Sequence, residues 1–359
     1  MNTKEQKIQA FDPNQPGLLD ASVFGLPFSS EESDIILLPV PWEVTVSYGS
    51  GASKGPAAIR DASYQVDLLH EEFPDLWKLG IYMEDISQRW EQDSASLALK
   101  AKPVISALEK GELLDEAHPL YTEVQAINTA CKALKDAVRE KTASYLTKGK
   151  LVALIGGDHS TPLGYYEALL DQHTSFGILH FDAHMDLRKG YEGFTYSHAS
   201  IMYNTMQLDG VSRLVQVGIR DFCPEEYDFT QENKHKIKVF SDRYLQQSLF
   251  EGESWAQLCE TIIDQLPDKV CISFDIDALQ AWYCPNTGTP VPGGLSYEQA
   301  CYLLSRLADS GKEIIGFDLV EVSPGTDEWD GNVGARLLFH LCGVLAKGQK
   351  LPTGIPVQF

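Results

Sequence analysis

Apolar positions along this chain fall into short runs rich in β-branched residues, which alternate with longer segments of helical periodicity. The short runs predict eight strands, at residues 34–40, 79–83, 151–155, 177–182, 214–219, 237–240, 269–274 and 314–319. The longer segments predict helices at residues 56–69, 123–147, 162–170, 255–265, 297–309 and 333–345. This largely alternating order is typical of an α/β fold, in which helices cover both faces of a parallel sheet.

Two regions stand outside this alternation. Residues 84–120 are acidic and helix-prone and predict a helical insertion with a solvated face. Residues 1–33 predict an extended arm in front of a single catalytic domain at 34–359. The arm is too apolar for a free tail and too short for its own core, so we expect it to be buried. The first expected place is a subunit boundary, and the second is the surface of its own chain. Its apolar residues are Phe11, Leu18, Leu19, Val23, Phe24, Leu26 and Phe28.

Composition narrows the classes of function. The 359 residues carry 51 acidic and 29 basic side chains, a formal net charge of −22, and 43% of them are hydrophobic. A polyanion repels phosphate backbones and anionic headgroups, so neither nucleic acid nor a membrane is an expected partner, whereas a small cation is attracted. The seven cysteines include no C-x-x-C pair and the first residues contain no apolar signal-like run, which favours reduced thiols and a cytoplasmic protein.

Asp and His residues concentrate where three predicted strands end. His159 follows a glycine pair in IGGDHS, and the segment HFDAHMD places three polar side chains at alternate positions. The segment SFDID does the same with two carboxylates. Alternate residues of an extended chain share one face, and ligands of open α/β sheets bind at the carboxyl ends of the strands. The polar residues at these three strand ends are His159, Asp182, His184, Asp186, Asp275 and Asp277.

The charges of this set favour a two-metal site. Four carboxylates bring −4 and would repel each other strongly without cations, whereas two divalent ions bring +4 and two neutral imidazoles complete the ligands. A ligand set rich in carboxylate suits Mn²⁺, although the Irving–Williams order allows Ni²⁺, Co²⁺ or Zn²⁺ to bind as tightly. We therefore expect two divalent ions, Mn²⁺ first and Ni²⁺ as an alternative.

At these residues the sequence resembles the ureohydrolase superfamily of arginases, agmatinases, guanidinobutyrases and formimidoylglutamases. The motifs GGDHS, FDAHMD, SFDIDALQ with CPNTGTPVPGG, and DLVEV stand in the order and approximate spacing of that family. The resemblance implies a three-layer α/β/α sandwich with an eight-stranded parallel sheet, and a trimer or hexamer. It also implies two Mn²⁺ ions, bridged by hydroxide and held by His159, Asp182, His184, Asp186, Asp275 and Asp277.

The same resemblance implies a reaction and its catalytic residues. In the implied reaction, the metal-bridging hydroxide attacks a guanidinium carbon, a C–N bond is cleaved and urea is released. The guanidinium carbon is a poor electrophile and needs a strong nucleophile. Metal-bound water, with a pKa of about 7, supplies such a nucleophile at neutral pH. His198 corresponds to the family's proton shuttle and Glu321 to the acid that holds the guanidinium group. With Asp277, they are the expected catalytic residues.

Departures from the family pattern bear on the substrate. Gln280 replaces the last Asp of D-x-D-x-x-D-P, which leaves the metal ligands unchanged. Arg188 stands where arginases carry an Asn, which argues against arginase, and D-L-R at 186–188 is reminiscent of formimidoylglutamases. His198 favours the agmatinase-like branch instead. The loop at 41–49 adds Trp42, Glu43 and Tyr48, whose charge and aromatic faces suit a small cation.

The sequence thus predicts a hydrolase of a small cationic guanidino compound, such as agmatine or guanidine, with Trp42, Glu43, Tyr48 and Arg188 as substrate contacts. A formimidoylglutamase or a guanidino-acid hydrolase is the next reading, followed by an arginase. The alternative from another class is a catalytically silent scaffold of the same fold, which metal analysis of the purified protein would distinguish because a silent scaffold binds no metal.

Overall fold

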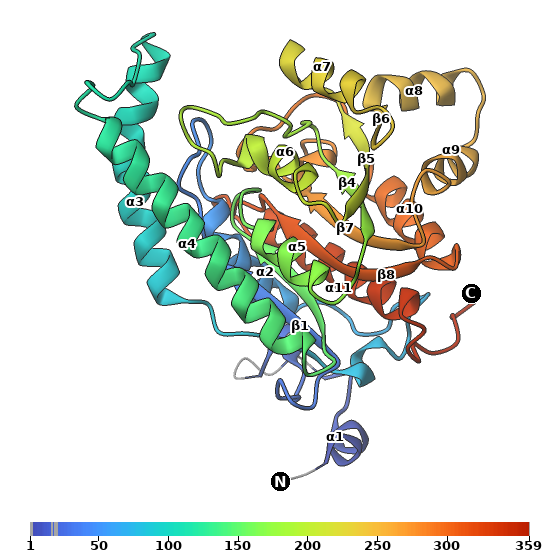
Figure 1. Ribbon diagram of the computed structural model, residues 1–359. Helices are drawn as coiled ribbons and strands as arrows, with labels where there is room; N and C mark the ends of the chain where they lie inside the picture. The colour runs from blue at the N-terminus through green and yellow to red at the C-terminus, as the bar shows by residue number, and fades with distance from the viewer. Residues whose placement is uncertain (1–2, 16, 18–20, 359) are drawn as a thin grey trace.

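The computed structural model describes residues 3–15, 17 and 21–358. Its centre is one sheet of eight strands in the order β2-β1-β3-β8-β7-β4-β5-β6, in which every pairing is parallel (Figure 1). The strands are β1 (Ile35–Val40), β2 (Ile81–Met83), β3 (Leu151–Gly156), β4 (Phe176–Phe181), β5 (Val211–Ile219), β6 (Ile237–Ser241), β7 (Lys269–Asp275) and β8 (Glu313–Val320). All eight strands expected from the sequence are present.

Eleven α-helices are formed by the described residues. They are α1 (Lys4–Ala10), α2 (Gly55–Ser63), α3 (Gln88–Glu109), α4 (Tyr121–Leu146), α5 (Leu163–Leu170), α6 (Ile201–Met206), α7 (Pro224–Glu232), α8 (Asp242–Phe250), α9 (Trp255–Ile263), α10 (Tyr297–Asp309) and α11 (Trp329–Gly348). The expected helix at 56–69 ends early, at Ser63, because the chain turns there. Within the described part of the chain, no helix combines the length and the hydrophobicity that crossing a bilayer requires.

Helices cover both faces of the sheet, which confirms the three-layer α/β/α sandwich. Along β1, Ile35 and Leu37 enter one buried cluster, whereas Ile36 and Leu38 enter another on the opposite face. Helices α2, α9, α10 and α11 contribute to the first cluster, and α3, α4, α5 and α6 to the second (Figure 1). A strand buried on both faces is apolar at consecutive positions, which is why these runs were readable in the sequence.

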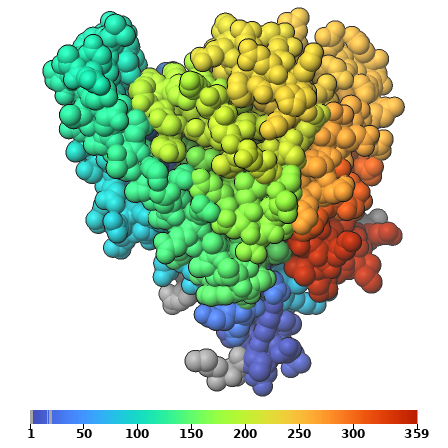
Figure 2. All heavy atoms as spheres, in the orientation of Figure 1, coloured from blue at the N-terminus to red at the C-terminus, as the bar shows by residue number. Residues whose placement is uncertain are grey.

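The insertion at 84–120 is mostly helix α3, which packs against α4. Ala101, Val104, Ile105 and Ala107 of α3 are buried, while most of its remaining side chains face solvent. In the space-filling view, the connected ends of these two helices stand out beyond the sheet region (Figure 2). Glu109, the C-terminal residue of α3, is exposed.

The N-terminal segment differs from the expected extended arm. Lys4–Ala10 is helical, with a capping box between Thr3 and Gln6. Val23, Phe24, Leu26 and Phe28 are buried in the core of their own chain, and Phe11 packs against it, so this part of the segment occupies the second of the two expected places. Leu18 and Leu19 lie outside the described residues.

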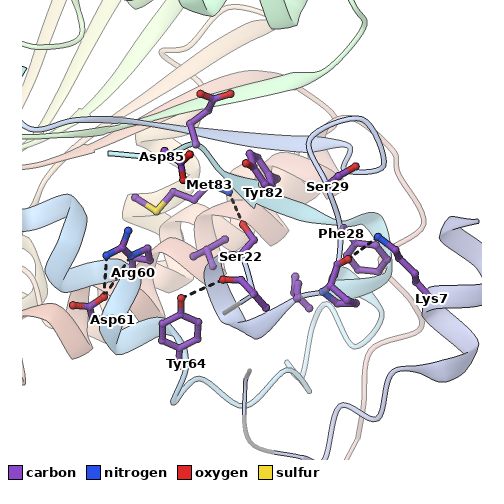
Figure 3. Close-up of a pocket in the computed structure, with 15 residues that line it drawn as sticks. Lys7, Ser22, Phe28, Ser29, Arg60, Asp61, Tyr64, Tyr82, Met83 and Asp85 are labelled. Carbon is purple, nitrogen blue, oxygen red and sulfur yellow. Dashed lines mark hydrogen bonds and ion pairs between the residues drawn. The ribbon is translucent and has the colours of Figure 1, made fainter. Parts of the chain in front are cut away.

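A cavity of about 960 Å³ lies between this segment, α2 and β2 (Figure 3). Around it, Ser22 Oγ accepts a hydrogen bond from the Met83 backbone at 3.0 Å, and Tyr64 donates one to the Ala21 carbonyl at 3.3 Å. Lys7 donates to the Pro27 carbonyl at 2.9 Å. These contacts hold the segment on its own chain, and the cavity shares no lining residue with the site described below.

Because the segment is part of the core, we expect Leu26→Ala to lower the free energy of unfolding by about 2–5 kcal/mol, the usual cost of truncating a buried leucine. Leu26 is fully buried, whereas Leu113 is 85% exposed and supplies the matched control Leu113→Ala. Urea denaturation of the three proteins measures the difference. Equal midpoints for the two variants would show that the segment does not contribute to the core in solution.

A buried histidine pair predicts a pH dependence of stability. His340 of α11 is 4% exposed, and its Nδ1 lies 3.2 Å from His70 Nε2. Burial, and then the neighbouring His70, lower the pKa of His340 to about 3. In the unfolded chain the pKa is about 6.5, so between these values the unfolded state binds the extra proton. Neutral, buried His340 therefore contributes fully to the free energy of unfolding above pH 6.5. This contribution is lost, by about 1.4 kcal/mol per pH unit, as the pH falls toward 3.

We expect His340→Gln to remove this component from the slope of unfolding free energy against pH between 6.5 and 4.5. His235 is exposed, so His235→Gln is the matched control and should leave the slope as it is. Denaturant titrations at several pH values measure the slopes. An unchanged slope in His340→Gln would mean that His340 is already protonated in the folded state.

Candidate metal centre and active-site pocket

The strand order brings the three polar segments together. Strands β3, β8, β7 and β4 are consecutive neighbours in the sheet, so the residues that follow their carboxyl ends meet at one edge. His159 follows β3, the Asp182 to Asp186 segment follows β4, and Asp275 ends β7. The structure therefore collects all six ligands expected from the sequence at one place.

His159 lies at the centre of one group of ligand atoms. Its Nδ1 is 3.1 Å from Asp182 Oδ2, 3.1 Å from Asp186 Oδ2 and 3.3 Å from Asp275 Oδ2. The imidazole is 1% exposed, yet among the described residues this Nδ1 has no hydrogen-bond partner. A buried nitrogen without a partner and three converging carboxylates are the donor set that a divalent cation satisfies.

A second group shares Asp182 with the first. His184 Nδ1 lies 3.4 Å from Asp182 Oδ1 and 3.1 Å from Asp277 Oδ2. The Asp182 carboxylate thus places one oxygen in each group. The other oxygen of Asp277 accepts a hydrogen bond from the Ala183 backbone at 3.0 Å, and Asp275 Oδ1 accepts one from the Asp277 backbone at 2.8 Å. Two sets of described residues bring ligand atoms close enough to hold a metal ion, His159 with His180, Asp182 and Asp186, and Asp182 with His184 and Asp277.

The electrostatics of this cluster of carboxylates also favour the binding of cations. Burial raises the pKa of Asp186 to about 7, and the charge of Asp182 adds to the effect. Burial also raises the pKa of Asp275 well above its usual range, with further contributions from Asp277 and Asp182. So many buried carboxylates repel one another, and cations between them relieve that repulsion.

Buried partners fix the orientation of His159. Its Nε2 lies 3.0 Å from Ser273 Oγ, which donates to Asp318 at 2.9 Å, and Tyr166 donates to the other oxygen of Asp318 at 2.6 Å. Because Nε2 is engaged, Nδ1 faces the carboxylates. Outer partners of this kind orient the histidines of metal sites.

A pocket of about 390 Å³ opens above the cluster. Of the residues expected from the sequence, eight line it: Tyr48, His159, His184, Asp186, Arg188, His198, Asp275 and Glu321. Asp182 and Asp277 lie next to the lining residues and are 0% and 3% exposed. The structure therefore brings four of the six expected metal ligands into one cavity with His198 and Glu321.

Sequence comparison identifies the family that shares this arrangement. The profile described as "Arginase family" matches residues 33–343. The chain belongs to the arginase family. An N(1)-aminopropylagmatine ureohydrolase from Thermus thermophilus is 31% identical over 314 residues, which cover 88% of this chain and 91% of that protein. An agmatinase from Bacillus subtilis is 28% identical and covers 86% and 90% of the two chains. These relatives confirm the resemblance to the agmatinase-like branch.

Structure comparison gives the same fold. The agmatine ureohydrolase of Thermoplasma volcanium superposes with a TM-score of 0.70 at 23% identity, covering 93% of this chain and 97% of that one. The eight-stranded parallel sheet with helices on both faces is therefore the arginase-like α/β fold, as the sequence predicted. The relatives named above are ureohydrolases.

Two expected substrate contacts of this arginase-family chain do not line the pocket. Trp42 is 3% exposed and lies in a different cavity, which α3 and α4 border. Glu43 is 8% exposed, and its carboxylate accepts hydrogen bonds from the backbone of Gly51, at 2.8 and 3.0 Å, and of Ser53, at 3.0 Å. Glu43 thus holds the loop that carries Tyr48, because its oxygens are already used by backbone N–H groups.

The remaining catalytic candidates face the cavity. His198 begins a short 3₁₀ turn and is half-buried; burial, followed by the charges of His184 and His159, lowers the pKa of His198 to about 4, so it is neutral at pH 7. Glu321 is 8% exposed, and its Oε1 accepts a hydrogen bond from the His159 backbone at 2.8 Å. Burial raises the pKa of Glu321 well above its usual range.

Arg188 and Gln280, the two departures from the family pattern, lie in different surroundings. The guanidinium carbon of Arg188 sits 5.0 Å from the centre of the Tyr191 ring, and its Nε is 3.8 Å from Glu226 Oε2. Gln280 does not line the pocket, and its backbone N–H donates a hydrogen bond to the Leu295 carbonyl at 2.9 Å. The replacement of the usual Asp at 280 therefore leaves the ligand groups intact.

Sequence reasoning missed His180. This residue of β4 is fully buried, and its Nε2 lies 2.8 Å from Asp182 Oδ2, while Gln216 Nε2 lies 3.0 Å from its Nδ1. With Gln216 donating to Nδ1, the proton on Nε2 points at the Asp182 carboxylate and fixes it. The sequence could have predicted this contact, because residues 180 and 182 are alternate positions of an extended segment and share one face.

Proposed function

We propose that this chain is a binuclear-metal hydrolase that cleaves a guanidinium C–N bond of a small cationic guanidino compound, of the agmatine or guanidine type, and releases urea. The observation that carries the proposal is the pair of ligand groups that share Asp182, one of which surrounds the unpartnered Nδ1 of buried His159. Names of relatives, agmatinase and N(1)-aminopropylagmatine ureohydrolase, support the same reaction class.

Six residues would hold the metals, which we propose to be Mn²⁺, with Ni²⁺ as the alternative: His159, Asp182, His184, Asp186, Asp275 and Asp277. Four carboxylates balance the charge of two divalent ions, and carboxylate-rich sites suit Mn²⁺. When bound, the ions supply a water nucleophile that is deprotonated near neutral pH. Asp277 keeps one oxygen on the Ala183 backbone and turns the other toward His184, so its carboxylate is held in the orientation in which it would bind a metal ion and thereby serve catalysis.

Glu321 and His198 act on the substrate. Glu321 lines the pocket beside His159 as a carboxylate acceptor for a guanidinium, and the cation would restore its charge by lowering its pKa. Neutral His198 would accept the proton that remains on the added oxygen and pass it to the departing nitrogen, which leaves as an amine. Both side chains line the same cavity as His159 and Asp275.

The charge of the pocket favours a cationic guanidino substrate over a guanidino acid or formimidoylglutamate. Glu109, Asp186, Glu192, Asp221, Glu226, Asp275 and Glu321 line it, against one arginine. Arg188 favours the second candidate, a guanidino acid or formimidoylglutamate, because its guanidinium could meet a carboxylate. Its proximity to Glu226 and its place over Tyr191 reduce its availability for that contact.

A substrate panel tests the proposal. Agmatine, guanidine, 4-guanidinobutyrate, formimidoylglutamate and arginine are assayed with Mn²⁺- and Ni²⁺-loaded protein, and urea and formamide are measured. We expect urea from a cationic substrate and about two metal ions per chain. Formamide alone would favour the formimidoylglutamase, and neither metal nor turnover would favour the silent scaffold.

We also propose that residues 34–359 act as one catalytic unit, in the cytoplasm, as a homo-oligomer, either a trimer or a hexamer. Because Val23, Phe24, Leu26 and Phe28 are buried on their own chain, the assembly would use another surface. Light scattering of the full chain tests it, and a monomer would exclude the oligomer.

A further inference from the structure

An amide side chain occupies a buried position of strand β5, beside the ligand groups. Gln216 is fully buried, and the other residues from Leu214 to Ile219 are apolar or glycine. In the parallel sheet it is the partner of His180 of β4. Its Oε1 has no hydrogen-bond partner among the described residues. Because a buried amide with an unpaired oxygen is less favourable than an apolar side chain, packing of the strand does not explain a glutamine here.

The Met185 carbonyl determines how this amide is turned. Gln216 Nε2 lies 2.8 Å from the Met185 oxygen. A carbonyl oxygen accepts hydrogen bonds and cannot donate them, so the amide must present its NH₂ group to Met185. The opposite orientation would bring two acceptor oxygens into contact. The backbone therefore fixes the direction of the first hydrogen bond in this chain of contacts.

The second hydrogen of the same NH₂ group fixes the histidine. Gln216 Nε2 lies 3.0 Å from His180 Nδ1, which must then be the acceptor. The neutral imidazole consequently carries its hydrogen on Nε2. This nitrogen lies 2.8 Å from Asp182 Oδ2 and donates to it. The direction of each hydrogen bond from Met185 to Asp182 thus follows from the one before it.

This order matters because His180 is close enough to bind a metal ion itself. The ligand atoms of His159, His180, Asp182 and Asp186 all lie within 4.8 Å of one another. An imidazole nitrogen coordinates a metal through its lone pair, so an Nε2 that carries a hydrogen cannot coordinate. With the hydrogen on Nδ1 instead, Nε2 would add a second imidazole to this group. Imidazole ligands favour Zn²⁺ or Ni²⁺, whereas carboxylates suit Mn²⁺.

We infer that Gln216 is a positioning residue that keeps His180 as a hydrogen-bond donor to Asp182, and out of the ligand set, so that the group around His159 favours Mn²⁺ over Zn²⁺. This inference rests on the proposed function and concerns the choice of metal. The competing explanation is that Gln216 only anchors the Met185 backbone between His184 and Asp186. Loss of such an anchor would weaken the binding of every divalent ion alike.

Competition between metal ions tests the inference. Gln216→Glu keeps the shape of the side chain but replaces its NH₂ group with an oxygen, which accepts a hydrogen bond from Nδ1 and leaves the Nε2 lone pair free. We expect the ratio of Zn²⁺ to Mn²⁺ affinity to rise about tenfold or more, since changes of outer partners alter metal affinity by about 10- to 100-fold. The added negative charge attracts both ions equally, so it cancels in the ratio.

Two further variants make the result specific. Gln231 of α7 is exposed, so Gln231→Glu is the matched control and should keep the wild-type ratio. Gln216→Met removes the hydrogen bond to His180 without adding charge, and its ratio should rise in the same direction. It replaces Gln216→Glu as the decisive variant if the urea midpoint shows that Gln216→Glu does not fold.

Nitrogen-15 NMR of histidine-labelled protein observes the ring directly. The His180 signal is identified by its loss in His180→Gln. We expect the hydrogen on Nε2 in the wild type, both without metal and with Zn²⁺, and on Nδ1 in Gln216→Glu. A residue that only anchored the Met185 backbone would leave this signal unchanged.

The outcomes separate this inference from the proposed function. An unchanged affinity ratio in the folded variant, or a wild-type His180 with its hydrogen on Nδ1, overturns the role of Gln216 and leaves the hydrolase intact. A wild-type protein that binds no Mn²⁺, Ni²⁺ or Zn²⁺ overturns the proposed function and this inference with it.

Discussion

Asp182→Ala and Asp275→Ala are each expected to lose bound metal and to lower turnover by about a thousandfold or more, since metal ions contribute several kcal/mol to the transition state. Asp182 places one oxygen beside His159 and the other beside His184, so its removal disturbs both ligand groups. Asp275 supplies an oxygen to the His159 group alone. We therefore expect Asp182→Ala to retain the fewest ions, and Asp275→Ala to retain part of the occupancy at the His184 group.

Metal content by mass spectrometry and urea production measure the two effects on the same samples. Asp171 is a surface carboxylate that pairs with Arg139 at 2.9 Å, so Asp171→Ala is the matched control for a lost acidic side chain. Near-normal activity with unchanged metal content in Asp182→Ala or Asp275→Ala would falsify the two-metal assignment. Folding of each variant is checked by the urea midpoint, because a residue at a strand end can also affect stability.

The sheet was predictable from the sequence because its strands are buried on both faces. All six residues of β1 and of β4 are buried, and consecutive apolar residues mark such strands without ambiguity. Helices α7 and α8 were not expected, because each has nine residues and buries only two of them. Helix α1 was also missed, although Thr3 and Gln6 form the T-x-x-Q signal of a capping box.

The clustering of the Asp and His residues was predictable for a related reason. Each lies at or just after the end of a strand whose place in the sheet is set by burial, and the parallel sheet aligns the carboxyl ends. In the loop at 41–49, no pattern of burial indicated where each side chain would point. Its closeness to the motifs suggested that Trp42 and Glu43 contact substrate, but side-chain direction in a loop depends on packing against α3 and α4 and on backbone N–H groups eight to ten residues away.

Glu109 and Glu192 could not be paired from the sequence. They are 83 positions apart, in an insertion and in a loop, and only the folded structure shows that both line one pocket. The acidic insertion therefore contributes more than the solvated face that its composition predicted. Its last helical residue is part of the lining of the active-site pocket.

His198→Ala should separate proton transfer from metal binding. We expect metal content to stay at the wild-type level, because His198 belongs to neither ligand group, and turnover to fall by about 10²- to 10⁴-fold, the usual contribution of a positioned acid–base residue. The pKa of about 4 makes His198 a neutral acceptor throughout the neutral range. Its removal should therefore abolish the acid limb of the kcat profile, near pH 4, as well as lower kcat across the neutral range.

Chemical rescue adds a readout that a merely structural role does not give. His198 is half-buried in the pocket wall, so its truncation leaves a space open to the cavity, and added imidazole should restore part of the turnover of His198→Ala. The control His235→Ala removes an exposed histidine and should behave as wild type, with or without imidazole. Loss of metal in His198→Ala would identify His198 as a ligand. Wild-type turnover in His198→Ala would instead assign the proton transfer to another group, because the reaction would then proceed without this base.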